Sequence, residues 1–312
     1  MIRPYRPGDA SKISTFLNTT QYKRDLQFWV WLNRILPEQE SIVYVAENNG
    51  EIIGHYAAIP QIINYKGNKI KAALGLHALV SEDFRNTFTI FKLTKGVYKT
   101  LKDNSFDMIY GFPNKKFKDF QVKVDKWKEI KTIHSFQGKI KQKVKNKNKI
   151  EKANNSYEDY YKISELLDIQ HQVENDRISI RKSVSYYIWR YLNHPHQLYD
   201  CYFILNNGAM VGFIVFKIFK SENEIRGHVI DFIKTQGLTN KGIINCAMAY
   251  FQGKVDTLSL WPIDDSFEKE LLEYGFTNEN GFETFFGYKK ISESIEVNFD
   301  NFYLQMGDSD AF

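Results

Sequence analysis

The stretch Ala72–Asn114 constrains the fold most strongly, because it reads as a strand, a turn, a helix and a second strand in direct succession. Residues 72–80 are an apolar run of strand type, and residues 106–110 form a shorter one. Between them, after a turn at residues 81–89, apolar residues recur at helical spacing: Ile90, Leu93, Val97 and Leu101. The stretch predicts an α/β unit whose helix begins immediately after the turn.

The turn carries a single cation, Arg85, beside the expected start of the helix. The first turn of an α-helix leaves backbone N–H groups without acceptors, and the helix dipole adds partial positive charge at the same end. Such an end binds phosphate groups. The sequence therefore predicts a phosphate or pyrophosphate site at residues 85–89. The alternative is a surface turn before an ordinary amphipathic helix.

The residues before this stretch predict three strands and one helix. Met1–Asp9 is a short strand and a Pro-Gly-Asp turn, which precede an amphipathic helix. Two β-rich segments, residues 41–47 and 51–60, flank Asn48-Asn49-Gly50, which is a strong hairpin signal. The predicted order up to residue 110 is strand, helix, strand, strand, strand, helix, strand.

This order resembles the CoA-binding core of the GNAT acyltransferase superfamily, and the resemblance covers roughly residues 1–140. The hairpin phrase Val45–Gly54 is common in that superfamily, and residues 82–85 (Glu-Asp-Phe-Arg) fit the approach to its CoA loop. The family continues with glycines, where this chain has residues 86–90 (Asn-Thr-Phe-Thr-Ile). The bulk of Phe88 opposes the close approach of backbone and ligand that glycine allows.

The resemblance implies that CoA or acyl-CoA is a co-substrate and that no metal is needed. The pantetheine arm would pair with a strand backbone, and the pyrophosphate would meet the start of the helix. The implied cofactor-binding residues are Leu79, Val80, Arg85, Asn86, Thr87, Phe88, Thr89 and Asn114.

The second half of the chain repeats the pattern more weakly. Strand-like residues 199–205 and 210–219 flank Asn206-Asn207-Gly208, again a hairpin signal, and residues 227–233 precede an apolar helix. No loop with Arg and glycines follows this strand. Residues 282–289 are expected to form the last strand of the second half. Residues 139–152, which are rich in lysine, are expected to form the last strand of the first half and a polar linker. The alternative is that this run of lysines contacts RNA or an acidic partner.

We therefore expect an α/β (α+β) protein with two tandem GNAT-like domains, each a mixed, mostly antiparallel sheet flanked by helices. Residues 1–142 form the CoA-binding domain, residues 143–154 a Lys-rich linker and residues 155–312 the second domain. The length of 312 residues suits two domains.

Acyl transfer to an amine needs a base for the amine proton and an acid for the leaving thiolate. His77 lies within the strand from which the family often projects its base, so we expect it to be the base; the alternative is a hydrogen-bonded core histidine. Tyr110 is the expected acid, and the alternative is a tyrosine that only packs.

The acceptor side is less constrained. Arg24 and Trp31 follow the first helix, in the segment that covers the acceptor pocket in this superfamily, and would suit the diphosphate and base of a sugar nucleotide. Trp261 would line a cleft or fill an interface between the halves. Asp308 or Asp310 would grip a substrate amine or hydroxyl if the tail folds back; the alternative is a disordered tail.

Composition adds modest bounds. Hydrophobic residues at 43% supply a packed core, and a net charge of +5 favours anionic ligands without demanding nucleic acid. No stretch is apolar and long enough to span a bilayer, and the N-terminal residues lack the apolar segment of a signal peptide. Cys201 and Cys246 lack metal-ligand spacing, so we expect a cytoplasmic protein without a metal site.

The predicted function is a sugar N-acyltransferase that moves an acyl group from CoA to the amino group of a nucleotide-linked, dTDP-type amino-dideoxy sugar. Residues 111–114 (Gly-Phe-Pro-Asn) are similar to a phrase of GNAT-type acyltransferases from bacterial surface-polysaccharide gene sets, which implies a step in O-antigen or lipopolysaccharide synthesis. The alternatives are a Fem-type transferase that uses aminoacyl-tRNA and a non-catalytic GNAT pair that binds a ligand. Small molecules are the expected partners, and a homodimer stays open.

Overall fold

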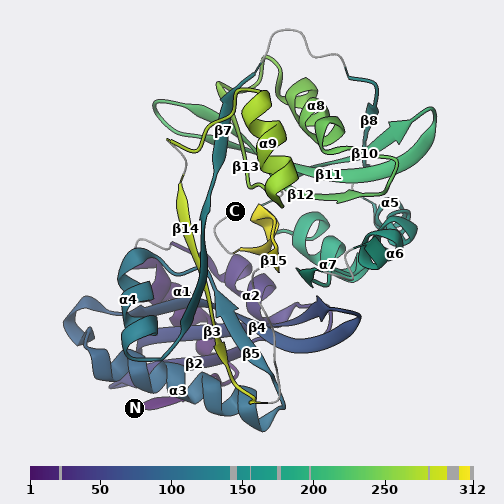
Figure 1. The fold of residues 1–312 in the computed structure, drawn as a ribbon. Helices are drawn as coiled ribbons and strands as arrows, with labels where there is room; N and C mark the ends of the chain where they lie inside the picture. Colours follow the sequence, from purple (N-terminus) through teal and green to yellow (C-terminus); the bar gives the residue numbers. More distant parts are fainter. Residues whose placement is uncertain are drawn as a thin grey trace. The chain divides into compact units, whose positions relative to one another are not determined.

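The computed structural model describes residues 1–20, 23–140, 146–154, 156–173, 177–196, 198–279, 282–293 and 302–309. It is a mixed α/β fold with two sheets flanked by helices (Figure 1). The chain forms two compact units, each made from several stretches. Unit 1 comprises residues 1–131, 194–196 and 285–300, and unit 2 comprises residues 132–193, 197–284 and 301–312.

The sheet of unit 1 has the strand order β1-β2-β3-β4-β5-β14-β6. Its strands are β1 (Ile2–Pro4), β2 (Ile42–Asn48), β3 (Glu51–Tyr65), β4 (Asn68–Val80), β5 (Met108–Gly111), β14 (Glu283–Lys290) and β6 (Lys128–His134). β4 and β5 are parallel, whereas β1 to β4 are antiparallel neighbours and β14 is antiparallel to β5. The parallel pair requires a crossover, which the helix between the two strands supplies.

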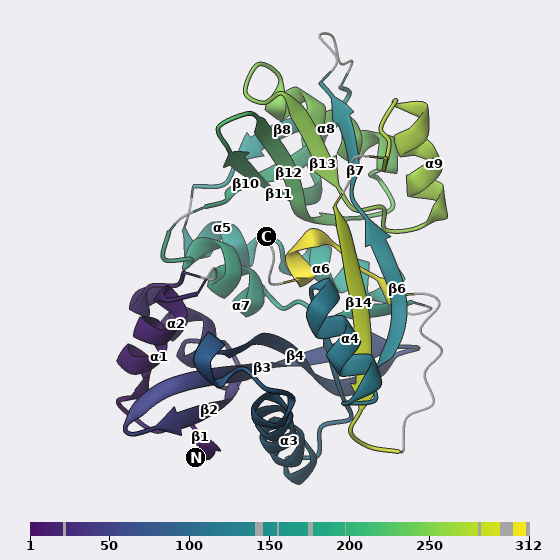
Figure 2. The same cartoon turned by 90° about the vertical axis from the view of Figure 1, so that its left-hand side faces the viewer.

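Helices cover both faces of this sheet (Figure 2). They are α1 (Asp9–Asn18), α2 (Leu26–Arg34), α3 (Thr87–Asp103) and α4 (Lys115–Lys123). The apolar stripe of α3 packs against the face that carries Tyr56 and Ala58 of β3. Side chains alternate along a strand, so His55 points to the other face, where it meets Trp29 of α2.

The sheet of unit 2 has the strand order β7-β13-β12-β11-β10-β8. Its strands are β7 (Phe136–Lys139), β13 (Thr257–Leu260), β12 (Ile225–Lys234), β11 (Ala209–Lys220), β10 (Asp200–Asn206) and β8 (Lys149–Lys152). Only β12 and β13 are parallel, and α8 (Asn240–Phe251) connects them. The parallel pair with its crossover helix repeats the topology of β4, α3 and β5, which confirms the predicted fold class.

The remaining elements of unit 2 are helices, helical turns and two short strands, which pair with each other (Figure 1). They are α5 (Tyr157–Tyr161), α6 (Ser164–Val173), β9 (Ile178–Ile180), α7 (Val184–Tyr187), a π-helical turn (Ile188–Leu192), α9 (Asp265–Glu273), β15 (Phe302–Tyr303) and a short helical turn (Met306–Asp308). α8 and α9 pack on the face that carries Ile214 and Phe216. Phe213 points to the other face and contacts Tyr160 of α5 and Tyr187 of α7.

Both predicted hairpins are confirmed, and their turns show why. Asn49 and Gly50 have φ values of 49° and 82°, and Asn207 and Gly208 have 49° and 83°. Two successive left-handed residues give the turn whose twist matches that of the flanking strands, and Asn-Gly adopts it at least cost.

Two strands lie in sheets that the sequence did not predict. β14 pairs with β5, as Tyr288 with Tyr110, so the expectation that it closes the second half was wrong. β8, which lies within residues 139–152, pairs with β10 of unit 2, as Lys152 with Tyr202, rather than ending the first half. A strand's partner depends on distant residues, which local periodicity does not report. The predicted boundaries 1–142, 143–154 and 155–312 stay a prediction.

His55 is fully buried in unit 1, and both of its ring nitrogens have a hydrogen-bond partner. Trp29 Nε1 lies 3.3 Å from His55 Nε2, and His55 Nδ1 lies 3.0 Å from the carbonyl oxygen of His77. The indole N–H can only donate, so Nε2 accepts and Nδ1 carries the proton that the carbonyl receives. Only the neutral ring makes both bonds, and burial lowers the pKa of His55 to about 4.

We expect the free energy of unfolding to fall as the pH is lowered from 6.5 towards 4. The unfolded chain binds a proton at His55 near its ordinary pKa of 6.5, whereas the folded protein resists protonation until about pH 4. The loss attributable to this residue is on the order of 3 kcal/mol by the lower pH. Urea unfolding across this pH range measures it. His55→Asn should flatten the slope, and His134→Asn on β6 is the control; equal slopes in the wild type and His55→Asn would contradict the assignment.

Candidate active site

The parallel strands β4 and β5 stop pairing part-way along β4. Their register ends with Leu74 opposite Tyr110, although β4 continues to Val80. In the described part of the chain, β4 has only β3 and β5 as neighbours. The edge of β4 at residues 78–80 therefore has no strand paired to it on the β5 side. An open strand edge offers N–H and C=O groups to an extended ligand.

A β-bulge at His77 lies at the point where the two strands separate. His77 has a φ of 52°. The register with β3 shifts from the pair His55–Leu79 to the pair Ala57–Leu76, so β4 contains one extra residue. A bulge bends its strand and increases the local twist. It therefore accounts for the departure of β4 from β5.

A short helical turn (Glu82–Phe84), which carries two acidic residues, lies between β4 and α3; the first turn of α3 itself contains no acidic residue. Asn86 is the N-cap: its Oδ1 accepts the backbone N–H of Thr89 at 2.8 Å and the Thr89 hydroxyl at 3.1 Å. Helix geometry leaves the N–H groups of Thr87 and Phe88 without intrahelical acceptors. The Phe88 side chain is 63% exposed, with Lys92 Nζ 3.9 Å from the ring centroid, so most of the ring faces solvent. This helix end can receive an anion.

Arg85 turns back towards the end of β4. Its Nε and Nη2 lie 3.4 and 3.5 Å from the carbonyl oxygen of Val80, and Nη1 lies 3.6 Å from Glu82 Oε1. These distances are at the long end of the hydrogen-bond range. The side chain is also 63% exposed. A phosphate would bind the guanidinium more strongly than this carbonyl does.

His77 lies inside unit 1 with only 8% of its surface exposed. Its Nδ1 is buried and has no hydrogen-bond partner among the residues that the structure describes. Burial lowers the pKa of His77 well below 6.5, and the neighbouring side chains of His55 and Arg24 act in the same direction. The imidazole is therefore neutral at pH 7 and has an uncommitted ring nitrogen. These are properties that a proton acceptor needs, and its role stays a prediction.

Tyr110 and Asn114 both have structural contacts. Tyr110 is buried on β5, and its ring meets Phe112 at 6.3 Å and Phe286 at 6.1 Å between centroids. Asn114 is the N-cap of α4, where its Oδ1 accepts the N–H of Phe117 at 3.0 Å. The predicted roles of Tyr110 as the acid and of Asn114 as a CoA contact stay predictions.

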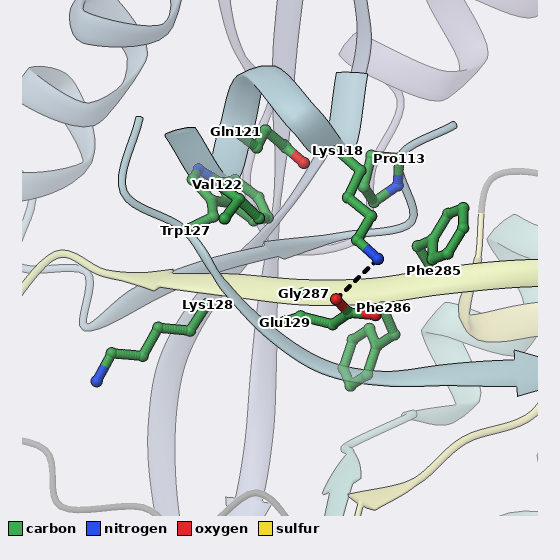
Figure 3. A pocket seen from close by; sticks show the side chains of 10 residues that line it. All are labelled: Pro113, Lys118, Gln121, Val122, Trp127, Lys128, Glu129, Phe285, Phe286 and Gly287. Carbon is green, nitrogen blue, oxygen red and sulfur yellow. Dashed lines mark ion pairs between the residues drawn. The ribbon is translucent and has the colours of Figure 1, made fainter. Parts of the chain in front are cut away.

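A shallow apolar pocket lies beneath α4, between β6 and β14 (Figure 3). Trp127, Phe285 and Phe286 contribute aromatic walls. Lys118 of α4 crosses the pocket: its Nζ is 2.7 Å from Glu129 Oε2 and 4.0 Å from the centroid of the Phe285 ring. The sequence did not predict this pocket, because β14 enters unit 1 from the far end of the chain and no local signal announces it.

The predicted acceptor residues fall into two groups. In unit 1, Arg24 and Trp31 both contact Phe28: the guanidinium carbon is 4.9 Å from its ring centroid, and the Trp31 ring is 5.3 Å away. In unit 2, Trp261 is buried and donates from Nε1 to Ser135 Oγ at 3.0 Å. Asp308 is also buried in unit 2. Asp310 lies outside the described residues, and all five roles stay predictions.

Unit 2 repeats the bulge but occupies the adjoining strand edge with its own chain. β12 contains one extra residue opposite β11, between Val229 and Asp231, and pairs with β13 only at residues 226–228. The side chain of Gln305 then bonds both backbone groups of Phe232. Its Oε1 accepts the N–H at 2.6 Å, and its Nε2 donates to the carbonyl at 2.9 Å. The edge that is open after the bulge of β4 is thus filled after the bulge of β12.

A buried ion cluster beside this edge was not anticipated from the sequence. Lys182 Nζ lies 2.7 Å from Asp231 Oδ2 and 2.7 Å from Asp308 Oδ1. The hydroxyls of Tyr187 and Tyr191 donate to Asp231 at 3.2 and 2.7 Å. Burial lowers the pKa of Lys182, but the two carboxylates outweigh it and hold that pKa above its ordinary value. The three charged residues come from separate stretches, so no motif reveals them.

The described residues contain no cluster of three or more His, Cys, Asp or Glu side chains suited to a metal ion. Among the helices that the structure describes, none combines the length and the apolar character that crossing a membrane requires.

Comparisons with known proteins agree with this geometry. Residues 1–118 match a family model described as an acetyltransferase (GNAT) domain. No curated protein matches the chain in sequence. The chain is similar in structure to a GCN5-related N-acetyltransferase from Anabaena variabilis, with a TM-score of 0.73 and 10% identity over 94% of this chain and 73% of that one.

Two further solved structures are similar to this chain. A conserved protein from Enterococcus faecalis V583, described as a probable N-acyltransferase, has a TM-score of 0.72 and 9% identity over 93% of this chain and 72% of that one. N-myristoyltransferase from Saccharomyces cerevisiae, solved with bound myristoyl-CoA, has a TM-score of 0.62 and 11% identity over 98% of this chain and 83% of that one. At these identities the likeness shows the fold.

The family match and the fold together support an N-acyltransferase enzyme, as predicted.

Proposed function

We propose that unit 1 binds acyl-CoA along the open edge of β4 and at the start of α3, and transfers the acyl group to a primary amine. The observation that carries this proposal is that β4 and β5 stop pairing at Leu74 and Tyr110, while β4 continues to Val80. The first turn of α3, which begins at Thr87, then carries no acidic side chain. Pantetheine is an extended chain with amide groups that can pair with a strand edge. A pyrophosphate suits a helix N-terminus beside an arginine.

The phosphate contacts proposed here differ from those of a glycine-rich loop. The cap formed by Asn86 already uses the N–H of Thr89, so the pyrophosphate would receive the N–H groups of Thr87 and Phe88 together with Arg85. Unit 2 is not proposed as a CoA site, because Gln305 occupies the backbone of Phe232 there. Of the two tandem domains, only the one in unit 1 would therefore bind CoA.

The proposed reaction uses His77 as the base and Tyr110 as the acid. The neutral amine nitrogen attacks the thioester carbonyl while His77 takes up the amine proton. A backbone N–H of β4 stabilises the oxyanion. The carbon–sulfur bond then breaks, and the thiolate of CoA receives a proton from Tyr110. Acyl transfer is complete with an amide and free CoA as products.

The proposed acceptor is a nucleotide-linked amino-dideoxy sugar, of the dTDP type, in a cytoplasmic step of surface-polysaccharide synthesis. Arg24 supports the nucleotide part of this proposal. Its guanidinium stacks on Phe28, and its Nε is buried without a hydrogen-bond partner in the described part of the chain. A cation held on an aromatic ring, with a donor to spare, suits a diphosphate. The net charge of +5 is consistent with an anionic acceptor.

Replacing Thr87 by proline should weaken CoA binding about tenfold or more, since it removes a backbone N–H that would contact a charged phosphate. Thr87 is the first residue of α3, where proline is tolerated, and Asn86 before it is extended (φ −141°, ψ 160°), as proline demands. Calorimetric titration with CoA measures the effect. Thr87→Ala, which keeps the N–H, is the matched control.

Arg85→Ala should abolish most of the CoA affinity in the same titration. The exposed Lys99 of α3 provides a charge-matched control, Lys99→Ala. Unaltered affinity in both Thr87→Pro and Arg85→Ala would remove the CoA site from the start of α3.

His77→Asn should lower kcat by about 100-fold, because it removes the proposed base. Asparagine is preferred to alanine because it adopts positive φ more readily, and the bulge needs the φ of 52° at this residue. The lowered pKa of His77 keeps the ring neutral at pH 6.5 and above, so wild-type activity should decline only below that pH. Steady-state kinetics across this pH range test both points. An unchanged rate and pH profile in His77→Asn would exclude His77 from the chemistry.

Release of the CoA thiol from acetyl-CoA measures the reaction. We expect kcat/KM to be at least about 100-fold higher with a dTDP-linked amino sugar than with the free amino sugar, because the free sugar has no diphosphate to form charge-assisted contacts. Arg24→Ala should raise KM for the nucleotide sugar with kcat nearly unchanged; Lys23→Ala is the neighbouring control. Equal efficiency with both acceptors would contradict the nucleotide-sugar proposal. Transfer from aminoacyl-tRNA without CoA would favour the Fem-type alternative.

A further inference from the structure

A small hollow in unit 2 is lined by several polar side chains, some of whose buried atoms have no hydrogen-bond partner among the described residues. It lies among α6, β9 and the segment 303–308, and its lining includes His171, Ser179, Lys182 and Asp308. It has room for a single group of the size of a water molecule. The hollow is formed by described residues of unit 2 alone.

Two of these side chains are left without hydrogen bonds. Ser179 is 2% exposed, and its Oγ has no partner among the residues that the structure describes. The Nδ1 of His171 is buried and lacks a described partner as well. Burial lowers the pKa of His171 to about 4, so its ring is neutral at pH 7 and can accept a hydrogen bond. Buried polar groups without partners cost stability, which a bound ligand would recover.

The charges behind the hollow do not balance. Lys182 lies between Asp231 and Asp308, so one cation faces two carboxylates. Asp231 receives two tyrosine hydroxyls in addition, whereas Asp308 Oδ1 has the ammonium group at 2.7 Å without a well-formed hydrogen bond. Burial raises the pKa of Asp308, and the neighbouring carboxylate of Asp231 acts in the same direction.

Arg190 is buried nearby but is not part of the lining; its Nη2 donates to the carbonyl oxygen of Ser309 at 3.2 Å. The hollow therefore presents acceptor atoms on Asp308, Ser179 and His171, beside one ammonium group that faces two carboxylates.

We propose that this hollow binds the ammonium group of a small primary amine. An ammonium group has three donors and no acceptor, it is about the size of a water molecule, and its positive charge offsets the excess carboxylate. It would donate to Asp308 Oδ1, Ser179 Oγ and His171 Nδ1. Unit 2 would thereby supply an amine site of its own. The inference does not depend on CoA binding, since it concerns residues of unit 2 only.

Titration of the full chain with methylammonium chloride, which carries the smallest alkyl group of any primary amine, tests this proposal in the absence of CoA. Methanol is the uncharged ligand of matched shape. We expect saturable heat and a higher melting temperature with the amine and neither with the alcohol. Ser179→Ala should weaken amine binding at least tenfold, and Ser221→Ala, in the turn between β11 and β12, should leave it unchanged.

Asp308→Asn removes the charge but keeps an acceptor for the backbone N–H of Gln305, and it should weaken binding further. If the circular dichroism spectrum shows that Asp308→Asn is unfolded, the amine affinities of Ser179→Ala and Ser221→Ala decide whether the proposal holds. Absence of amine binding, or equal affinity in those two serine variants, would overturn the proposal and leave the hollow as a water site. If the wild-type protein binds CoA but not the amine, this inference fails while the proposed function is unaffected.

Discussion

The bulge at His77 is the constraint on which the candidate site depends. One extra residue at positive φ turns β4 away from β5, which leaves the strand edge unpaired and directs the chain into α3. The conformation costs energy, and neighbouring elements hold it. His55 of β3 donates to the carbonyl of His77, and Trp29 of α2 donates to His55. Packing on both neighbours thus fixes the geometry that a ligand would meet.

Unit 2 shows how the same topology can lead to a different outcome. Its parallel pair, crossover helix and bulge match those of unit 1. After the bulge, however, the amide of Gln305 satisfies both backbone groups of Phe232, in the manner that a ligand amide would. Beside it, Lys182 forms ion pairs with the buried carboxylates of Asp231 and Asp308. Identical strand order therefore does not imply identical binding, because side chains from distant segments decide what fills the edge.

Local signals predicted much of the fold and part of the site. The Asn-Gly pairs gave both hairpins, since the left-handed turn has few residue types that adopt it cheaply. The apolar stripe of α3 and the turn with Arg85 placed a helix end after β4. The positive φ of His77 and the buried surroundings of Tyr110 were not predictable. Both depend on contacts with residues that lie far away in the sequence, whereas the cap formed by Asn86 is local and involves only Thr89.

The sequence by itself determined the order of strands and helices, the two repeated α/β patterns and the cation beside the start of α3, because these follow from local conformational preference and periodicity. Only the tertiary structure decided that β14 joins the sheet of unit 1, that Gln305 occupies the edge of β12 and that Lys182 meets Asp231 and Asp308. The physical reason is that strand pairing and burial of charge are long-range: their free energy depends on which segments exclude water from one another, and that arises only when the chain has folded.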